Sequence, residues 1–416
     1  LNMAKEKDTN FDVAVVGGGP AGMMAAGKAA SKGFRVVLIE KNASLGKKLL
    51  LTGNGRCNLS NAEFNLRELA KNYNNGEFLF HAFSVFGPKE VIEFFDKLGV
   101  KTKIEKDGRV FPESDKVEEV LEALKRYLTE NKVEILLNSE VVNVVKKAKK
   151  IEKIILKSRE ITAKKYILCA GGKSYPLTGS NGSGYKLAEK LGHTISDLMP
   201  ALTPLKIKEQ WVKDLQGISF KNVKINGELG EFIFTHSGIS GPGIFNISAK
   251  VGDLLAKGLP AQAGEAKISF DFFPLLNQEE LFKKIDEVLK RYAKKSAKNI
   301  LSDFIPAKLS EVILDNLKID KNKIANNMSK IEKRAIVKAL KGLEVTAEDT
   351  FGFEQAMATR GGISLKEIDH KTMKSKLIDN LFFAGEIIDV DGKTGGFNLQ
   401  ACWSTGNLAG ASTVEF

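Results

Sequence analysis

Hydrophobic and polar positions near the start of the chain separate two short apolar runs from a helix-forming stretch between them. The apolar runs, Phe11–Val16 and Arg35–Glu40, have the length and composition of buried strands. The intervening stretch, Ala21–Lys32, has the composition of a helix, which Gly33 can end. A strand, a helix and a second strand in this order form a βαβ unit, which predicts a parallel sheet with a right-handed crossover.

Similar patterns continue as far as about residue 195. Runs of helical composition alternate with apolar runs that are typical of strands. The predicted helices are Pro88–Leu98, Lys116–Asn131 and Gly184–Leu191, and the predicted strands are Val133–Asn138, Ser139–Lys146, Lys150–Lys157 and Lys164–Cys169.

The pattern changes over the next part of the chain. From Leu202 to Phe273, short alternating runs are broken by Gly and Asn, which predicts a small antiparallel β unit. Asn277–Leu343 is almost wholly helical in composition, and Pro306 is expected to begin one of its helices. An apolar strand at Asn380–Phe383 and a final helix at Asn398–Gly410 follow.

These elements predict an α/β domain that is split in the sequence. We expect the α/β domain to comprise residues 1–195 and 344–416. The insertion, residues 196–343, is expected to have an antiparallel β part over about 196–275 and a helical part over about 276–343.

Charge changes this picture little. The net charge is +12, and only 9 of the 63 basic residues are arginine. A basic protein can attract nucleic acid, anionic substrates or membrane surfaces. Groove-binding proteins more often concentrate arginine and interleave aromatic residues, whereas these lysines are spread over many segments. We therefore favour a solvated, lysine-rich surface over nucleic-acid binding.

The cysteines and the apolar runs bear on the compartment. Cys57, Cys169 and Cys402 form no CxxC pair and are odd in number, so we expect neither a disulfide framework nor a metal site, and the reducing cytoplasm fits. No apolar run approaches the roughly 20 residues of a membrane span. The N-terminal LNMAKEKDTN is polar, so no secretory signal is expected, and the residues before Met3 are interpreted as foreign. Nothing in the sequence defines an oligomeric state.

A glycine motif follows the first predicted strand. Gly17 permits a tight turn, Gly19 lets the backbone approach a pyrophosphate, and Gly22 lets the helix pack closely on the sheet. The helix then presents its N-terminal N–H groups and its dipole to the phosphates. Glu40 closes the second strand and can accept hydrogen bonds from a ribose 2′-hydroxyl, which disfavours NADP. The motif predicts a dinucleotide, either FAD or NAD.

Later segments favour FAD. The strands in Lys164–Gly172 and Leu381–Glu386 each end in glycine, where backbone can approach an extended dinucleotide. Gly395–Leu408 begins with two glycines and leads straight into a helix, whose dipole can face a flavin ring. NAD does not need this last element. No second complete strand–glycine–helix unit with an acidic partner is present, so a dedicated NADPH domain is not expected.

Four motifs resemble those of the BaiN/YhiN-like flavoproteins, which are described as aminoacetone-oxidase-like or NAD(P)/FAD-dependent oxidoreductases. The motifs are GKKLLLTGNGRCNLSN (residues 46–61), FTHSGISGP (234–242), ATRGGI (358–363) and DVDGKTGGFNLQ (389–400). The match extends over nearly the whole chain. It implies a Rossmann-like FAD-binding domain of the glutathione-reductase/fumarate-reductase type, an inserted domain and non-covalent FAD.

The resemblance also implies a set of cofactor-binding residues. Gly17, Gly19, Pro20, Ala21, Gly22 and Glu40 would meet the AMP and pyrophosphate half, as would Ala170, Gly171, Gly172 and the backbone of Val141; Lys41, Lys48, Thr52, Gly53, Asn54, Gly55, Arg56, Cys57 and Asn58 would lie along the cofactor; and Gly385, Glu386, Gly396, Phe397, Asn398 and Leu399 would meet the ribityl chain and the ring.

Few residues are candidates for catalysis. His236, one of four histidines, can shuttle protons at neutral pH, or it can be a hydrogen-bonded turn residue. Arg56 and Arg360 can bind an anionic substrate or stabilise reduced flavin, or each can form a structural ion pair. Cys57 adjoins the flavin loop but lacks a partner cysteine nearby, while Cys169 and Cys402 are expected to be packing residues.

We therefore expect an FAD-dependent oxidoreductase that passes hydride between a small organic substrate and the flavin, in a cleft between the two domains. The family resemblance offers amine oxidation, with O2 as acceptor, and reduction of an unsaturated ketone, and NAD(P)H is a candidate transient electron donor. The sequence leaves these open. A flavoprotein that binds and modifies RNA and a non-catalytic FAD redox sensor are the alternatives.

Overall fold

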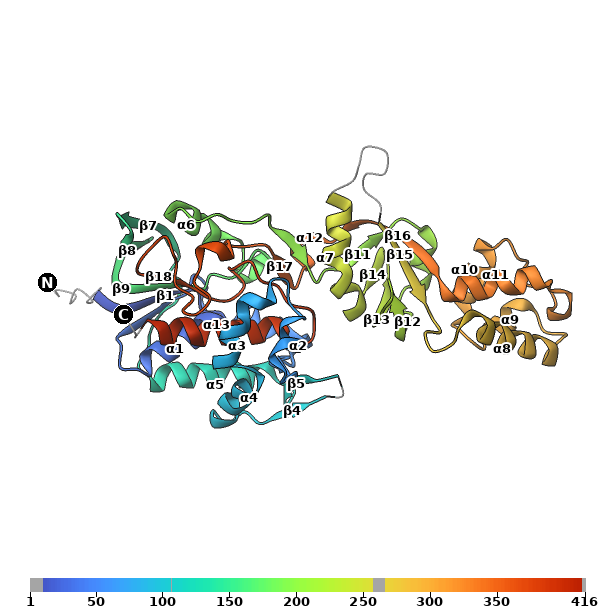
Figure 1. Cartoon of the computed structure of the whole chain (residues 1–416), viewed down its shortest axis with the longest axis horizontal. Coiled ribbons are helices and arrows are strands. Elements are labelled where there is room, and N and C mark those ends of the chain that lie inside the picture. Colours follow the sequence, from blue (N-terminus) through green and yellow to red (C-terminus); the bar gives the residue numbers. More distant parts are fainter. Residues whose placement is uncertain (1–9, 106, 257–265, 414–416) are drawn as a thin grey trace. The chain divides into compact units, whose positions relative to one another are not determined.

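The computed structural model describes residues 10–105, 107–256 and 266–413. The described chain divides into two units (Figure 1). The first comprises the described residues up to Ala201 together with those from Phe353 onward, and the second is Leu202–Gly352. Residues 1–9, on which the expectation about a secretory signal rests, lie outside the described residues.

A mixed sheet of seven strands forms the centre of the first unit. Its strands are β1 (Asn10–Val16), β2 (Val36–Ile39), β6 (Glu134–Leu136), β7 (Val141–Lys147), β8 (Lys150–Leu156), β9 (Glu160–Leu168) and β18 (Leu381–Phe383). The order is β6-β2-β1-β9-β8-β7, and β18 also pairs with β9.

Parallel pairing joins the strands at the centre of this sheet. β1 pairs in parallel with β2 and β9, and β18 pairs in parallel with β9. Their paired segments 13–15, 36–39, 166–168 and 381–383 are buried, which explains the continuous apolar runs there. The predicted βαβ unit is therefore confirmed. The β18 pairing also brings a segment that follows the second unit back into the sheet.

Two helices pack closely against each other in the first unit. They are α1 (Pro20–Ala30) and α13 (Phe397–Ser412), which lie side by side in Figure 1. A Cβ atom at Gly406 would lie 2.5 Å from the Ala21 carbonyl oxygen, and one at Gly410 would lie 2.5 Å from that of Ala25. Small residues are therefore required where the two helices meet.

Shorter elements complete the first unit. The helices are α2 (Leu66–Ala70), α3 (Phe80–Val85), α4 (Pro88–Lys97), α5 (Val117–Glu130), α6 (Ser183–Leu191) and α12 (Gly352–Gln355), whose first residue belongs to the second unit; β3 (Ser60–Asn61), β5 (Arg109–Pro112) and β4 (Thr102–Ile104) form a small sheet, and β10 (Met199–Ala201) pairs with β17 (Ala358–Arg360). The sequence pattern did not predict α2 and α3, because each is too short to show a helical period.

A closed barrel of six strands forms the centre of the second unit. In the order of pairing, the strands are β11 (Leu205–Ile207), β14 (Gly238–Ser240), β13 (Glu228–Thr235), β12 (Ser219–Ile225), β15 (Ala266–Asp271) and β16 (Leu343–Thr350); the helices are α7 (Pro242–Ala256), α8 (Gln278–Arg291), α9 (Ala297–Leu301), α10 (Ala307–Asn316) and α11 (Lys330–Lys341).

The second unit corrects two sequence predictions. β16 pairs with both β15 and β11, so the boundaries of this unit lie at 201/202 and 352/353 and not at 195/196 and 343/344. The other correction concerns α7, which lies in the stretch that was interpreted as β structure. Its buried Ile244, Ile247 and Val251 follow a helical spacing that its β-branched residues and glycines concealed.

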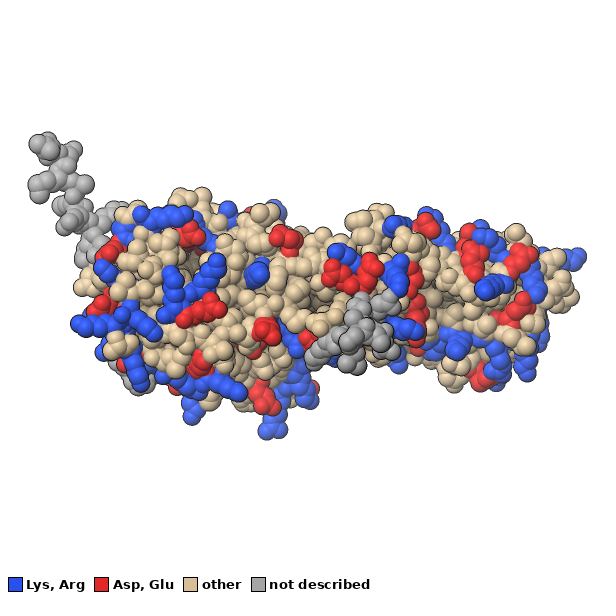
Figure 2. All heavy atoms as spheres, turned by 90° about the horizontal axis from the view of Figure 1, so that it is seen from above, with Lys and Arg blue, Asp and Glu red and all other residues tan. Residues whose placement is uncertain are grey.

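The surface mixes charges of both signs. In Figure 2, Lys and Arg are interspersed with Asp and Glu over the visible face. Some of these charges are paired, as in Lys333–Asp286 at 2.8 Å and Lys341–Asp271 at 2.6 Å. Within the described ranges, no helix is both long and apolar enough to cross a membrane.

Candidate functional site

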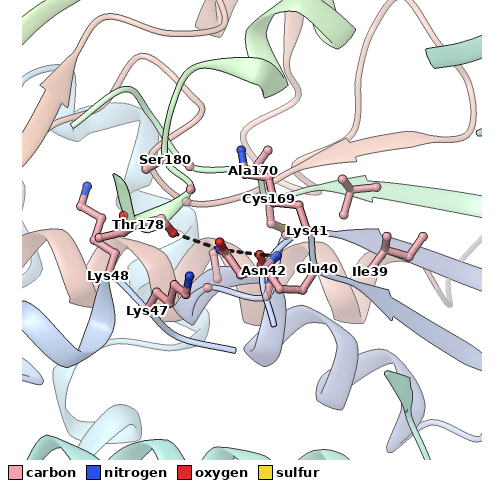
Figure 3. A pocket seen from close by; sticks show the side chains of 18 of the residues that line it. Ile39, Glu40, Lys41, Asn42, Lys47, Lys48, Cys169, Ala170, Thr178 and Ser180 are labelled. Carbon is pink, nitrogen blue, oxygen red and sulfur yellow. Dashed lines mark hydrogen bonds between the residues drawn. The ribbon is translucent and has the colours of Figure 1, made fainter. Parts of the chain in front are cut away.

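Two adjoining cavities lie in the first unit. They enclose about 890 Å³ and 660 Å³, including their open sides, and Figure 3 shows side chains that line the first of them. Both are lined by Pro20, Lys48, Gly385, Glu386 and Cys402, so together they form one elongated site.

The turn between β1 and α1 forms one wall of the first cavity. Gly17 has φ +108°, and a Cβ atom there would lie 2.3 Å from the Cys169 carbonyl oxygen. A Cβ atom at Gly22 would lie 1.8 Å from the Gly17 carbonyl oxygen. Gly19, in contrast, faces open space, with nothing within 4 Å of a Cβ atom. Among the described residues, no side chain caps the N-terminus of α1, so its N–H groups remain available to an anion in the cavity.

Glu40 is held rigidly at the end of β2. One carboxylate oxygen accepts a hydrogen bond from the Gly18 N–H at 2.7 Å. The other accepts from the Asn42 N–H at 2.8 Å and from the Asn42 side-chain amide at 2.7 Å. That amide also donates to the Thr178 carbonyl at 3.0 Å, as Figure 3 shows. Glu40 is thus oriented at the cavity, where its remaining lone pairs can accept ribose hydroxyls.

Polar groups opposite this turn complete the first cavity. The Ser180 hydroxyl is buried, lines the cavity and has no hydrogen-bond partner among the described residues. The Lys41 ammonium donates to Asn181 at 2.8 Å and to Ser183 at 3.1 Å. Burial lowers the pKa of Lys41. An orphaned hydroxyl together with a glycine-lined turn fits a polar, phosphate-containing ligand.

An ion pair lies where the two cavities meet. The Lys48 ammonium contacts one Glu386 oxygen at 2.6 Å. The other Glu386 oxygen accepts from the Ser174 hydroxyl at 2.8 Å and from the Thr359 N–H at 2.7 Å. Apolar side chains line much of the second cavity, including Leu49, Ile388, Val390, Leu399 and Ala401. This combination suits a flat ring with a polar chain attached.

The N-terminus of α13 lies beside the second cavity. Its N-cap residue, Gly396, has φ +98° and lacks a side-chain cap. A Cβ atom at Gly396 would lie 2.1 Å from the Ser60 carbonyl oxygen, so only glycine fits there. With its amide oriented to satisfy its neighbours, Asn58 accepts from the Gly396 N–H at 3.0 Å. Asn398 and Leu399, on the first turn, line the cavity and bring the helix dipole to it.

The structure brings most of the predicted cofactor residues together around the two cavities, whereas residues 53–58 line neither of them. Residues that line the cavities are Gly17, Gly19, Pro20, Ala21, Glu40, Lys41, Lys48, Thr52, Val141, Ala170, Gly171, Gly385, Glu386, Asn398 and Leu399. Gly22, Gly53, Asn54, Gly55, Arg56, Cys57, Asn58, Gly172, Gly396 and Phe397 line neither cavity.

The candidate catalytic residues are not brought together. His236 is exposed on the turn between β13 and β14 in the second unit. Arg360, at the end of β17 in the first unit, lines neither cavity. Arg56 contacts Glu105 at 2.5 Å and Asp115 at 2.7 Å, and its guanidinium stacks on the Phe111 ring at 3.9 Å. These contacts favour the structural ion pair for Arg56 over an anion-binding role.

The Arg56 contacts lead to a testable expectation. Arg56→Met removes both ion pairs but leaves the cavity lining unchanged. We expect a lower melting temperature with unchanged FAD affinity, measured by differential scanning fluorimetry of the apoprotein and by titration with FAD. A large loss of FAD affinity without a change in melting temperature would contradict the structural role.

The cysteines have no activated thiol. Burial raises the pKa of Cys57 and of Cys402 to about 12, and it raises the pKa of Cys169 as well. A thiol with so high a pKa is a poor nucleophile. Cys402 nevertheless lines both cavities, where it contributes packing.

Sequence reasoning missed several residues of the site. Asn42, Thr178, Ser180 and Ser183 line the first cavity, and Met357 lines the second. Three of these lie near the glycine-rich stretch 179–184, which marked a turn but did not indicate which side chains face the cavity.

Asp391 was also missed. One of its carboxylate oxygens is buried and has no hydrogen-bond partner among the described residues. Burial raises the pKa of Asp391 to about 6, against the opposing effect of the nearby Arg360 charge. Asp391 lies next to Val390, which lines the second cavity. Such a group is typical of a functional site, and the only signal in the sequence was its place in DVDGKTGGFNLQ.

Comparison with known proteins adds to this geometry. The HI0933-like protein Rossmann domain family matches residues 11–412. A 3-dehydro-bile acid delta(4,6)-reductase from Clostridium scindens is 35% identical over 415 residues, covering 97% of this chain and 99% of that protein. A ribosomal RNA dihydrouridine synthase from Haemophilus influenzae is 29% identical over 401 residues, covering 94% and 95%.

A solved structure shares the fold. The 3-ketosteroid delta1-dehydrogenase from Sterolibacterium denitrificans gives a TM-score of 0.55 at 14% identity and covers 97% of this chain and 99% of that one. At this identity the likeness concerns the fold alone. Together with the family match, it confirms the predicted α/β class with a Rossmann-type FAD-binding domain.

Proposed function

Because the chain belongs to the HI0933-like Rossmann-domain family, we propose that it is an FAD-dependent reductase of carbon–carbon double bonds conjugated to a carbonyl group. The family match and the 35% identical relative confirm the resemblance carried by the glycine motifs. The proposal narrows an oxidoreductase function to one kind of bond.

The observation that carries the proposal is a chemistry shared by two relatives with different substrates. By its name, the Clostridium scindens protein reduces double bonds of a bile acid with an oxo group. The Haemophilus influenzae protein, by its name, makes dihydrouridine, which is uridine with the double bond beside a ring carbonyl reduced. Reduction of a conjugated double bond is the step common to both names. These relatives favour reduction over amine oxidation.

The elongated site fits FAD. Its adenosine ribose would meet Glu40, its pyrophosphate the N-terminus of α1, and its ring the apolar second cavity beside the N-terminus of α13. When bound and reduced, FAD supplies a hydride. The N–H groups at the N-terminus of α13, which have no side-chain cap among the described residues, would stabilise negative charge on a ring held in the second cavity.

The chain must also supply a proton. The double bond takes up a hydride at one carbon and a proton at the carbon next to the carbonyl, so an acid is needed close to the site. Asp391 is the carboxyl group best suited to hold this proton, because burial keeps a part of it protonated near neutral pH.

The substrate itself has two candidates. A small unsaturated ketone is favoured by the 35% identity to the bile-acid reductase. A uridine in RNA is favoured by the ribosomal RNA relative. A non-catalytic redox sensor would need neither substrate.

Transfer of electrons to a conjugated double bond tests the proposal. Under anaerobic conditions, the flavin of the holoprotein is reduced with NADH or NADPH, or with dithionite if neither reacts, and then mixed with cyclohexenone, a conjugated steroid ketone or a uridine-containing RNA. We expect the visible absorption of oxidised flavin to return with at least one of them, with a saturated product. Cyclohexanone is the control, because it has the carbonyl but no double bond.

A different outcome would contradict the proposal. Reoxidation by cyclohexanone as fast as by cyclohexenone would show that the double bond is not the acceptor. Bleaching of the oxidised flavin by aminoacetone, without reoxidation by any conjugated substrate, would favour amine oxidation. Absence of any reaction would favour the redox sensor.

A further inference from the structure

A third hollow of the first unit is separate from the two cavities of the site. It encloses about 1660 Å³, including its open side, and lies where α2 and α3 meet the segment around Leu365. We refer to it as the aromatic-basic groove, defined by Arg67, Lys71, Glu77, Phe78, Phe80 and Lys366. None of these residues lines the first or second cavity.

Two aromatic rings form the apolar part of the aromatic-basic groove. Phe80, the first residue of α3, is 42% exposed. Phe78 is half-buried, and its ring centroid lies 6.4 Å from that of the exposed His370. An exposed phenylalanine ring gains free energy when a flat ligand covers it. The rings therefore indicate a ligand that can stack.

The charges of the aromatic-basic groove are mainly positive. Arg67 and Lys366 are exposed, and neither side chain has an acidic partner among the described residues. Lys71 pairs with Glu68 at 2.7 Å, but both side chains are at least half exposed, so this pair is weak. Glu77 is the one carboxylate in the lining. The balance of charge indicates an anionic ligand.

The floor of the aromatic-basic groove is joined to the flavin site through one loop, residues 389–397. The Tyr73 hydroxyl donates to the Phe397 carbonyl at 2.7 Å, and the Asn74 N–H donates to the Asp391 carbonyl at 2.8 Å. The Asn75 amide donates to the Asp389 carbonyl at 2.9 Å. Val390 of this loop lines the second cavity. The loop 389–397 therefore connects the aromatic-basic groove to the second cavity, where we propose that reduction takes place.

We infer that the aromatic-basic groove binds a single-stranded segment of RNA that flanks the nucleotide to be reduced. Bases stack on Phe78 and Phe80, while phosphates lie beside Arg67, Lys71 and Lys366. A single strand offers both flat bases and phosphates, which is the combination that the lining matches. The inference rests on the proposed function, in its form with uridine in RNA as substrate.

Binding of a labelled oligonucleotide tests the inference. Fluorescence anisotropy of the holoprotein is measured with a single-stranded oligouridylate of about ten nucleotides, a length within the range that one binding surface contacts. We expect binding that weakens as salt rises. The Arg67→Glu/Lys366→Glu variant should bind at least about tenfold more weakly. The slope of the logarithm of its binding constant against the logarithm of salt concentration should become shallower by about 1.4, since each of the two lost phosphate contacts removes about 0.7.

Matched variants separate stacking from charge. Phe80→Ala should weaken binding by about five- to hundredfold with an unchanged salt dependence, the effect of losing one stacked base. Glu77→Lys should tighten binding, because it removes the carboxylate from the lining. The control, Lys89→Glu/Lys97→Glu on α4, makes the same change of charge on exposed residues outside the aromatic-basic groove and should leave binding near wild type. Retained flavin absorbance shows that each variant is folded.

Several results would overturn the inference. They are absence of oligouridylate binding by the wild-type holoprotein at low salt, equal binding by the control and the groove variants, and equally effective competition by polyglutamate, which carries charge but no bases. Reduction of cyclohexenone by the wild-type holoprotein is measured in parallel. If the wild type reduces cyclohexenone but does not bind RNA, the groove inference fails and the proposed function stands; if the wild type binds RNA but reduces no conjugated bond, the proposed function fails.

Discussion

Gly19→Val is expected to give a stable protein that is purified without flavin. Gly19 is the residue of the glycine motif that faces the open first cavity, with nothing within 4 Å of an added Cβ atom. Its φ of −82° and ψ of −175° are accessible to valine, so the backbone can keep its conformation. The fold should therefore lose only the preference of glycine over valine at an N-cap, about 1 kcal/mol.

The expected effect on FAD is much larger. The valine side chain would occupy the space in which the N–H groups of α1 face the pyrophosphate. Loss of one or two charge-assisted hydrogen bonds corresponds to about 3 kcal/mol, or a roughly hundredfold weaker Kd. The measurement is a titration of apoprotein with FAD, followed by quenching of the flavin fluorescence, beside a melting curve of the apoprotein.

Gly22→Ala is the matched control within the same motif. A Cβ atom at Gly22 would lie 1.8 Å from the Gly17 carbonyl oxygen, so the turn itself must move. We expect this smaller substitution to destabilise the apoprotein by about 3 kcal/mol, which is the cost of overpacking a tight contact. The two variants should thus separate: Gly19→Val loses FAD and keeps stability, whereas Gly22→Ala loses stability even without FAD. Normal flavin content in Gly19→Val would place the pyrophosphate elsewhere.

The glycine motif also shows what sequence can and cannot predict here. The βα turn and its cavity follow from local chemistry, because strand, glycines, helix and Glu40 lie within one short segment. The joining of β18 and α13 to the same site was expected from glycine-terminated segments, and the family pattern supported it. Pairing of β18 with β9 and close packing of α13 on α1 place these segments at the cavities.

Interactions between distant residues could not be predicted in the same way. Arg56 pairs with Glu105, in the hairpin between β4 and β5, and with Asp115, in the turn between β5 and α5; only the fold brings these two residues to the 53–58 loop. The burial of Asp391 likewise depends on the segment around Asn74, which is more than three hundred residues earlier in the chain. The turn that carries His236 belongs to the second unit, within the segment that the sequence predicted as an insertion.

Asp391 is therefore the residue with the most to test, and Asp391→Asn is expected to stabilise the protein at alkaline pH. Burial raises the pKa of Asp391 from its ordinary 3.8 to about 6, so between these values the folded state binds more protons than the unfolded state. Stability from this group is then lost as pH rises through about 6 and regained as pH falls toward 3.8. The full pKa difference corresponds to a change of at most about 3 kcal/mol in the free energy of unfolding.

The measurement is denaturant unfolding of the apoprotein from pH 8 to pH 4. The free energy of unfolding of Asp391→Asn should exceed that of the wild type by about 2 kcal/mol at pH 8. This difference should disappear as pH approaches 4, because the wild-type carboxyl is then protonated. Asp389→Asn is the control: its carboxylate accepts a hydrogen bond from Ser196 at 2.8 Å, and no gain at pH 8 is expected. An equal gain in both variants would show a general charge effect.

The same substitution should lower the rate of reduction of a conjugated double bond while it raises stability. If Asp391 holds the proton for the carbon beside the carbonyl, Asp391→Asn should slow flavin reoxidation by cyclohexenone by about a hundredfold or more. The rate in the wild type should fall as pH rises above about 6, and the variant should lack this dependence. Flavin content should be unchanged, since Asp391 lines neither cavity. A variant that is more stable at pH 8 yet reduces cyclohexenone at the wild-type rate would confine Asp391 to a structural role.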